Sequence, residues 1–205
     1  MDSEPCKTCK KRLELCVCTD IHPQKARLHI LILQHPQEPD HDIGSALLTH
    51  LALPNSTLKI GLSWRNLSAA LGKPESSSAR WAVLYLGSGV KGEAVPKQPL
   101  QFVSQKGNPV DAPDQLDGIV VLDGTWSQAK SLWWRNAWLL KLRRIVLTPH
   151  HKSLYKELRK EPRRECLSTL ESVAEVLSLL GEKPEVSVQL KELFTKLLNK
   201  RRQMK

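Results

Sequence analysis

The stretch Ile119-Val-Val-Leu-Asp-Gly-Thr-Trp126 decides how this chain is expected to fold. Its apolar run ends in the carboxylate of Asp123, a glycine follows, and helical character begins at Ser127. A buried strand that turns tightly into a helix is where open α/β sheets bind ligands. We therefore interpret Asp123 as a candidate reacting group at the carboxyl end of a strand. A strand cap followed by an Asx turn is the alternative reading of the same residues.

Four further apolar segments of strand length lie around this stretch and alternate with helical patterns at 45–51 and 127–134. This alternation predicts an α/β fold, with a mostly parallel sheet flanked by helices. The segment 87–115 is rich in proline and glycine and predicts a long loop, with room for a short strand at 101–104. The expected strands span residues 28–33, 57–61, 81–86, 118–122 and 144–147.

The last third of the chain predicts two helices. Ser168-Thr-Leu-Glu171 matches a capping box, and an apolar stripe follows it at Leu170, Val173, Ala174 and Leu177. A final helix is expected at about 185–200, and the basic run after it is interpreted as a solvated end. Its inward side chains are expected to be Val188, Leu190, Leu193, Leu197 and Leu198.

Composition limits the classes of protein to consider. The 205 residues are 40% apolar, enough for one core with a small appendage, and the formal charge is +10. No apolar run approaches the roughly 18 residues that cross a bilayer, and no signal peptide pattern opens the chain, so we expect a cytoplasmic protein without a membrane partner. The basic excess favours a nucleic acid as partner, because the cations do not form one amphipathic helix.

Four cysteines gather at the start of the chain, as Cys6-x-x-Cys9 and Cys16-x-Cys18. In a reducing compartment such clustering indicates a metal more than disulfides, and four thiolates complete a tetrahedral zinc site with no open position. We expect a structural zinc arm over 1–25 and a catalytic domain over 26–205. A redox pair is the alternative. The distant Cys166 is interpreted as a small core residue.

In order along the chain, the cysteine cluster, His35-Pro-x-Glu38, Asp123-Gly-Thr-Trp126 and Leu167-Ser-Thr-x-Glu171 together resemble the DTW-domain family. The resemblance implies a SPOUT-like fold, in which a knot is expected, and a tRNA-uridine aminocarboxypropyltransferase that uses S-adenosylmethionine. The chain departs from the family pattern at Ile43-Gly-Ser-Ala46, where other members carry an Asn-Thr-Gly-Arg-like run.

The resemblance also assigns candidate site residues. Asp123 would be the base that takes the proton from N3 of the uridine, a step worth typically 10² to 10⁴ in rate. Three loops would hold S-adenosylmethionine through Leu86, Gly87, Gly124, Thr125, Trp126, Leu167, Ser168 and Thr169. The free amides at the start of the Ser168 helix would seat the methionine carboxylate, with pure capping as the alternative.

A dense group of cations between residues 141 and 164 is expected to hold tRNA phosphates beside the cofactor, with a solvated charged face as the alternative for about half of them. We interpret Trp133, Trp134 and Trp138 as packing or interface residues rather than as platforms for bases. A SPOUT-like methyltransferase and a non-catalytic zinc-containing RNA-binding protein are the alternative functions, and the oligomeric state, monomer or homodimer, is left open. The candidate residues for RNA are His35, Glu38, Arg143, Arg144, Arg159, Lys160, Arg163 and Arg164.

Overall fold

The computed structural model describes residues 4–39, 41–75, 77–85, 98–149, 151–155, 158 and 167–204. These residues form a seven-stranded sheet in the order β2-β1-β6-β3-β7-β4-β5. The five strands from β2 to β7 run parallel, and β4 and β5 extend the sheet as an antiparallel hairpin. The strands are β1 (His29–Gln34), β2 (Ser56–Ile60), β3 (Trp81–Leu84), β4 (Leu100–Val103), β5 (Pro109–Val110), β6 (Gly118–Asp123) and β7 (Arg143–Leu147).

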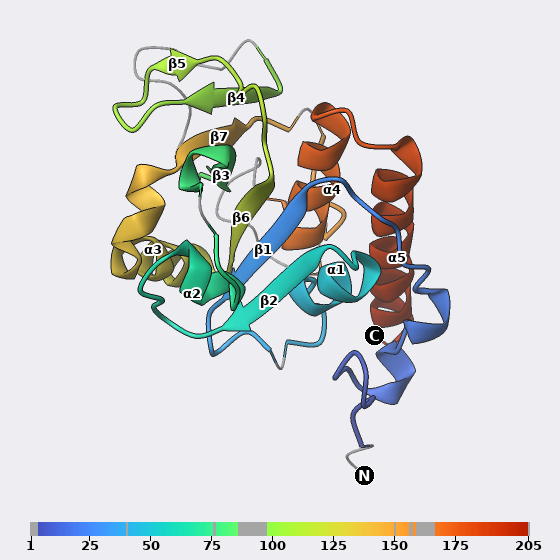
Figure 1. The fold of residues 1–205 in the computed structure, drawn as a ribbon. Helices are drawn as coiled ribbons and strands as arrows, with labels where there is room; N and C mark the ends of the chain where they lie inside the picture. Colours follow the sequence, from blue (N-terminus) through green and yellow to red (C-terminus); the bar gives the residue numbers. More distant parts are fainter. Residues whose placement is uncertain are drawn as a thin grey trace.

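Helices cover both faces of the sheet, so the expected α/β architecture is confirmed (Figure 1). One face carries α1 (Ala46–Ala52), α4 (Thr169–Leu179) and α5 (Pro184–Gln203). The other face carries α2 (Leu67–Leu71), α3 (Trp126–Arg135) and the 3-10 helix η4 (Ala137–Lys141). Three shorter 3-10 helices are η1 (Leu13–Leu15), η2 (Cys18–Asp20) and η3 (Ser78–Arg80).

The central strand β6 is buried along its whole length because both neighbours are strands and both faces are covered. Its first residue must be glycine. A Cβ atom on Gly118 would lie 2.5 Å from the ring of Trp81 and 2.7 Å from the carbonyl oxygen of His29. Close packing at one end of β6 therefore fixes the register that carries Asp123 to the other end.

The N-terminal arm packs on the main core and has no separate core of its own. Cys9, Leu15 and Val17 are buried in the same apolar cluster as β1, α4 and α5. Lys196 on α5 donates to Asp20 at 2.6 Å, and Lys200 donates to the carbonyl oxygen of Cys16. Figure 1 shows the arm (dark blue) beside the C-terminal end of α5 (dark red).

The structure corrects two expectations about α5. The prediction that Val188 points inward is wrong, because its side chain is 51% exposed. The basic end is also not a freely solvated tail, since Lys200 bonds to the arm and Arg202 donates to the carbonyl oxygen of Leu154 at 3.0 Å. The buried apolar side chains of α5 are instead Val186, Leu190, Leu193, Phe194, Leu197 and Leu198. Val188 lies two residues after Val186, so its side chain points to the other side of the helix.

The segment expected to be a long loop contains the β4–β5 hairpin, and the short strand expected at 101–104 corresponds to β4. The five-residue helix α2 was not predicted, although Asn66 caps its start and Gly72 ends it in the left-handed conformation. In the part of the chain that the structure describes, no helix is long and apolar enough to span a membrane.

Candidate active site

The candidate site lies where β1 and β6 end. Gln34 and Asp123 are the last residues of these strands and face each other in the register. Both side chains are buried, with 4% and 8% exposure. Gln34 Nε2 donates to Asp123 Oδ2 at 2.9 Å, and the hydroxyl of Thr169 donates to Asp123 Oδ1. Both carboxylate oxygens are therefore held in place, one from the sheet and one from the start of α4.

The turn after Asp123 depends on glycine. Gly124 has φ +156°, and a Cβ atom there would lie 2.9 Å from the Cβ of Gln128 and 3.4 Å from that of His35. Thr125 then caps α3, and its N–H donates to Gln128 Oε1 at 2.6 Å. The same Gln128 donates from Nε2 to Gln37 at 3.2 Å, so the turn and the loop after β1 are joined.

The loop after β1 lies against this turn. The N–H of His35 donates to the carbonyl oxygen of Asp123 at 2.9 Å. The imidazole of His35 is half-buried, and Glu38 is buried three residues further on. The structure thus brings His35, Gly124 and Thr125 to the carboxyl end of β1 and β6, where Asp123 lies.

The backbone N–H groups at the start of α4 have more hydrogen-bond partners within the protein than the sequence suggested. Ser168 and Glu171 form the predicted capping box, with Glu171 N–H to Ser168 Oγ at 3.1 Å and Ser168 N–H to Glu171 Oε2 at 3.0 Å. The N–H of Leu170 donates to Ser45 Oγ at 3.2 Å. Three of the four backbone N–H groups from Ser168 to Glu171 therefore already donate hydrogen bonds within the protein. Of the four, the N–H of Thr169 is the one left to bind the expected methionine carboxylate.

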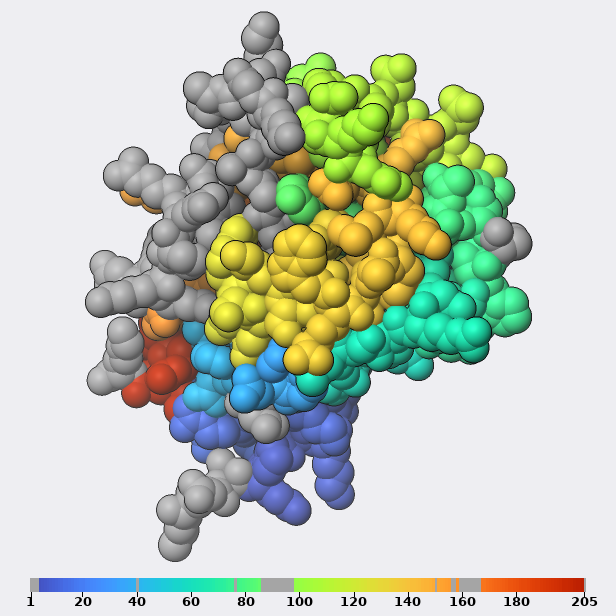
Figure 2. Space-filling model, turned by 90° about the vertical axis from the view of Figure 1, so that its left-hand side faces the viewer, coloured from blue at the N-terminus to red at the C-terminus, as the bar shows by residue number. Residues whose placement is uncertain are grey.

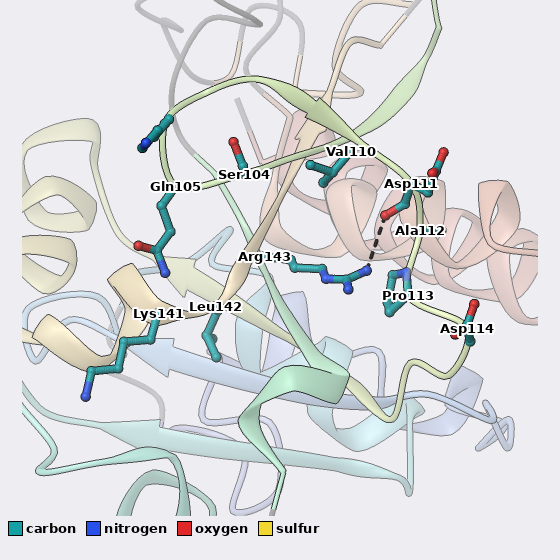
Figure 3. Close-up of a pocket in the computed structure, with 11 residues that line it drawn as sticks. Ser104, Gln105, Val110, Asp111, Ala112, Pro113, Asp114, Lys141, Leu142 and Arg143 are labelled. Carbon is teal, nitrogen blue, oxygen red and sulfur yellow. Dashed lines mark hydrogen bonds between the residues drawn. The ribbon is translucent and has the colours of Figure 1, made fainter.

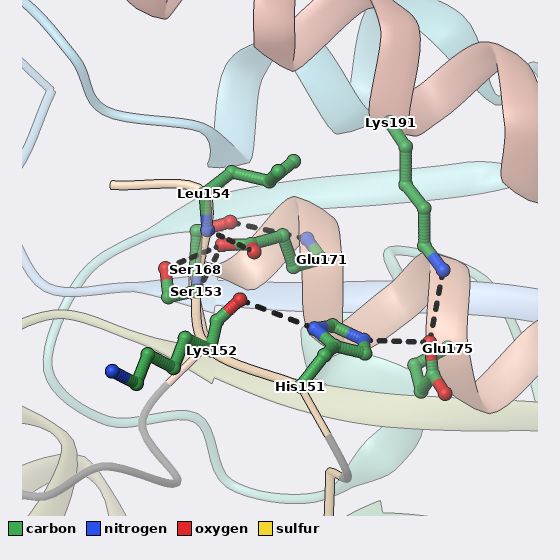
Figure 4. Close-up of polar contacts among 8 residues, drawn as sticks. All are labelled: His151, Lys152, Ser153, Leu154, Ser168, Glu171, Glu175 and Lys191. Atoms are coloured by element: carbon green, nitrogen blue, oxygen red, sulfur yellow. Dashed lines mark hydrogen bonds and ion pairs between the residues drawn. The ribbon is translucent and has the colours of Figure 1, made fainter. Parts of the chain in front are cut away.

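Glu171 also fixes the segment that follows β7. Its Oε1 accepts from the N–H of Leu154 at 2.7 Å, and its Oε2 accepts from Ser153 Oγ at 2.9 Å (Figure 4). This carboxylate is buried and accepts three hydrogen bonds from two segments. Loss of such an acceptor leaves buried donors unsatisfied, so Glu171 holds 153–154 against α4.

One turn further along α4, Glu175 makes a second tie to the same segment (Figure 4). It accepts from His151 Nε2 at 3.3 Å and from Lys191 Nζ of α5 at 3.0 Å. Burial opposes ionisation of Glu175, but the hydrogen bonds from Lys191 and His151 lower its pKa overall. Both carboxylates on this face of α4 therefore hold the chain that leads out of β7.

Lys11 connects the cysteine arm to the loop that precedes α1. Its side chain is 6% exposed, and Nζ donates to the carbonyl oxygens of Gly44 at 2.7 Å and His41 at 3.3 Å. Burial lowers the pKa of Lys11 to about 8, and the charges of Cys9, Asp42 and Asp123 oppose that fall. Lys11 is thus a structural cation near the site, and its ammonium is not presented to phosphates in solvent.

The four clustered cysteines converge. Their sulfur atoms all lie within 4.8 Å of one another, with Cys6 Sγ 3.5 Å from Cys16 Sγ and 3.7 Å from Cys18 Sγ. A tetrahedral ion with Zn–S bonds of about 2.3 Å needs sulfurs roughly 3.8 Å apart, so these separations fit. The N–H groups of Cys9 and Thr8 lower the pKa of Cys6 to about 6, which favours its thiolate. A redox pair would use only two thiols, whereas this geometry gathers four.

The structure does not bring the two described candidate arginines together with Asp123. Arg143 begins β7, so it lies at the amino end of the parallel strands, whereas Asp123 lies at their carboxyl end, and Arg143 donates to the carbonyl oxygen of Asp111 at 3.2 Å. Its side chain lines a cavity of about 650 Å³ between β7 and the β4–β5 hairpin (Figure 3). Arg144 instead stacks 4.8 Å from the ring centroid of Tyr85 and 5.3 Å from that of Trp133. Neither is placed to hold a phosphate beside Asp123.

Some of the remaining candidate residues lie near the site, and others lie outside the residues that the structure describes. Trp126 and Leu167 are half-buried and flank the strand end at the starts of α3 and α4. Of the other tryptophans, Trp133 is buried and Trp138 half-buried, as packing requires, whereas Trp134 is 70% exposed. Outside the described residues lie Leu86, Gly87, Arg159, Lys160, Arg163, Arg164 and Cys166.

Compared with profiles of known protein families, residues 3–202 match the DTW domain. The chain belongs to the DTW-domain family. It is 29% identical over 180 residues to tRNA-uridine aminocarboxypropyltransferase 2 of Macaca fascicularis, which covers 85% of this chain and 56% of that protein. The protein of the same name from Drosophila melanogaster is 31% identical over 188 residues, or 88% of this chain and 68% of the relative.

A third relative of that name, from Mus musculus, is 30% identical over 182 residues, covering 85% of this DTW-domain chain and 56% of the relative. The chain therefore spans little more than half the length of the two mammalian relatives. No solved structure matches it significantly.

The contacts of two residues at this candidate site of the DTW-domain chain were not predicted from the sequence. Gln34 could have been found, because it ends a buried strand expected to run parallel to the one that ends at Asp123. Lys11 gave no comparable signal. It stood among four basic residues around the cysteines, and only the tertiary structure shows that it is buried beneath the 41–44 loop.

Proposed function

We propose that this chain transfers the 3-amino-3-carboxypropyl group of S-adenosylmethionine to N3 of a uridine in tRNA. The observation that carries the proposal is the buried carboxylate of Asp123, held by Gln34 and Thr169 beside a glycine turn. The DTW-domain match and the names of the relatives supply the reaction class. A carboxylate fixed on both oxygens is suited to accept a proton at a defined point.

The chemistry assigns a task to each part of the site. Asp123 takes the N3 proton, and N3 forms a bond to the γ-carbon of the methionine arm while the bond from that carbon to sulfur breaks. The sulfonium leaves as a neutral thioether, so charge and atoms balance. Gly124, Thr125, Trp126, Leu167, Ser168 and Thr169 are proposed to hold the donor so that this carbon, and not the methyl group, lies about 3 to 3.5 Å from N3.

Finer features are part of the same proposal. The cysteine cluster is proposed to bind structural zinc, since the sulfur separations fit a tetrahedral ion and a full thiolate shell leaves no position for catalysis. His35 and Glu38 are proposed to orient the uridine or its loop. A knotted SPOUT-like topology, a division at residue 25 and a cytoplasmic location also stay predictions.

The decisive experiment compares the chain with Asp123→Asn. The protein is incubated with an unmodified tRNA transcript and S-adenosylmethionine, and the nucleosides are analysed by mass spectrometry. We expect aminocarboxypropyl-uridine from the unaltered chain and a loss of at least about 10² in rate from the variant, with folding and donor binding retained. Asp114→Asn, which changes an exposed loop carboxylate, should react normally.

The outcomes separate the possible functions. A turnover by Asp123→Asn equal to that of the unaltered chain would remove Asp123 from the mechanism. A methylated nucleoside would indicate a methyltransferase instead. Failure of the unaltered chain to bind S-adenosylmethionine at all would favour a non-catalytic RNA-binding protein.

A further inference from the structure

The exposed face of α3 holds an aromatic side chain that the core does not use. Trp134 is 70% exposed, although its neighbour Trp133 is buried. Lys130 lies one turn before Trp134 on the same face of the helix, since side chains at i and i+4 are neighbours. Arg135 Nε reaches back to Ser131 Oγ at 3.3 Å, which lays its guanidinium along this face. We call Lys130, Ser131, Trp134 and Arg135 the Trp134 patch.

The two segments that form this part of the surface, α3 with the stretch after it and the loop after β2, carry basic residues and no acidic ones. The sequence has no acidic residue from Gly124 to Pro149 and none from Ser56 to Pro74. The loop after β2 lies against the C-terminal end of α3, because Ser63 Oγ donates to the carbonyl oxygen of Arg135 at 3.0 Å. It brings the exposed Arg65 to this end of the helix. Figure 2 shows the α3 region (yellow to orange) open on the surface beside the β2–α2 segment (teal).

We propose that the Trp134 patch binds tRNA, with the indole stacked on an unpaired base and Lys130 and Arg135 paired with the flanking phosphates. An aromatic face bordered by cations is the arrangement by which proteins hold single-stranded nucleic acid, since every base offers a π face. This inference rests on the proposed function in one respect, the choice of tRNA as the RNA.

The position of the Trp134 patch fits a substrate whose uridine enters at Asp123. Trp134 follows Trp126, the first residue of α3, by eight residues, or about 12 Å along the helix axis. That length corresponds to three or four stacked bases at roughly 3.4 Å each. A nucleotide in the same loop as the target uridine can therefore reach the indole while the uridine occupies the strand end.

A second copy of this chain is a poorer occupant than RNA. In a twofold dimer built on the Trp134 patch the patch meets itself, so Lys130 and Arg135 would face identical cations, and segments 56–74 and 124–149 supply no acidic partner. Like charges placed opposite each other at an interface oppose association. RNA supplies the negative charge that these two segments lack.

The test measures tRNA affinity of the full chain by fluorescence anisotropy at several salt concentrations. Trp134→Ala should raise Kd by roughly five- to a hundredfold, the range measured for loss of one stacked base. Trp134→Phe should retain most of the affinity and Trp134→Leu should not, because leucine is apolar but has no π face. Val188→Ala on α5 removes another exposed apolar side chain, 51% exposed, from the other face of the sheet, and this variant should bind normally.

A second measurement isolates the cations. Arg135→Gln and Lys130→Gln should each weaken binding and reduce the slope of log K against log salt by about one. Each is exposed, so these changes should leave the unfolding curve nearly unaltered.

Three results would contradict the proposal that the Trp134 patch binds tRNA. The first is an unchanged tRNA affinity in Trp134→Ala, and the second is an equal affinity of the leucine and phenylalanine variants. The third is a dimer that is lost in Trp134→Ala while RNA binding is retained. No tRNA binding by the unaltered chain would overturn the proposal as well. Binding that depends on Trp134 but is followed by no transfer would support the surface and overturn the proposed reaction, so the two failures are distinguishable.

Discussion

The hydroxyl of Thr169 is the group that ties α4 to the carboxylate of Asp123. A hydrogen bond to a charged group contributes about 1.5–3 kcal/mol, and here it fixes the direction of the carboxylate. Thr169→Val keeps the shape of the side chain and removes this donor. We expect a fall of roughly ten- to a hundredfold in kcat, with tRNA affinity unchanged.

Single-turnover kinetics with tRNA and S-adenosylmethionine would measure this effect. Thr195→Val is the matched control, because Thr195 on α5 is also half-buried and donates from its hydroxyl to a backbone carbonyl, that of Lys191. An equal loss in both variants would mean that Thr169 acts through stability alone.

His29 makes stability depend on pH. Its ring bonds to Asn55 and Thr57 at 2.8 and 2.9 Å, and burial lowers its pKa below the ordinary value of 6.5. As pH falls below 6.5, the unfolded chain takes up the proton first, so this histidine stabilises the fold above that pH and loses the effect below it. Burial lowers the pKa of His50 in the same direction.

We therefore expect the free energy of unfolding in urea to drop between pH 7.5 and 5.5, and the drop to shrink in His29→Gln. The exposed His22 supplies the control His22→Gln, which should keep the full drop. An undiminished pH dependence in His29→Gln would show that other groups cause it.

At the scale of the element, α4 is joined to the segment after β7 by Glu171. In Glu171→Gln the side chain loses one acceptor and places an amide donor among the N–H groups of Leu154 and Ser168. We expect a loss of about 2 kcal/mol in unfolding free energy and faster hydrogen exchange at the Leu154 amide. Glu192→Gln, an exposed position on α5, should change stability by less than about 0.5 kcal/mol.

Elements were predictable where the sequence carries a local signal. The apolar runs gave β1 and β6, and Ser168 with Glu171 gave the start of α4 to the residue. The two-residue strand β5 could not be predicted, because it contains a proline and exists only by pairing with β4.

At the candidate site, too, the features with a local sequence signal were predictable and the long-range contacts were not. The position of Asp123 at the end of a buried strand is predictable because a strand, a glycine and a helix meet there in the sequence. Its contacts with Gln34 and Thr169 span 89 and 46 residues, so they depend on strand order and on how α4 packs. The exposure of Trp134 beside the buried Trp133 likewise follows from the phase of α3 against the sheet, which the run of apolar letters does not determine.

At the scale of the whole molecule, the cysteine arm and the main sheet share one core. Removal of the proposed zinc ion should therefore destabilise the entire chain and not the arm alone. A loss of about 3 kcal/mol would lower Tm by roughly 6–12 °C for a chain of this size. Calorimetry before and after a chelator should show one transition at a lower temperature, restored by Zn²⁺ and not by Mg²⁺. A Tm unaffected by the chelator would contradict a structural ion.

The reach of Lys11 from the arm to the carbonyl oxygens of His41 and Gly44 has a practical consequence. If the cysteine cluster binds the proposed zinc ion, loss of that ion would loosen the arm and with it the hydrogen bonds of Lys11 to the 41–44 loop. On the proposed function, purified batches should then differ in turnover per molecule in proportion to their zinc content, even when each gives a single band on a gel.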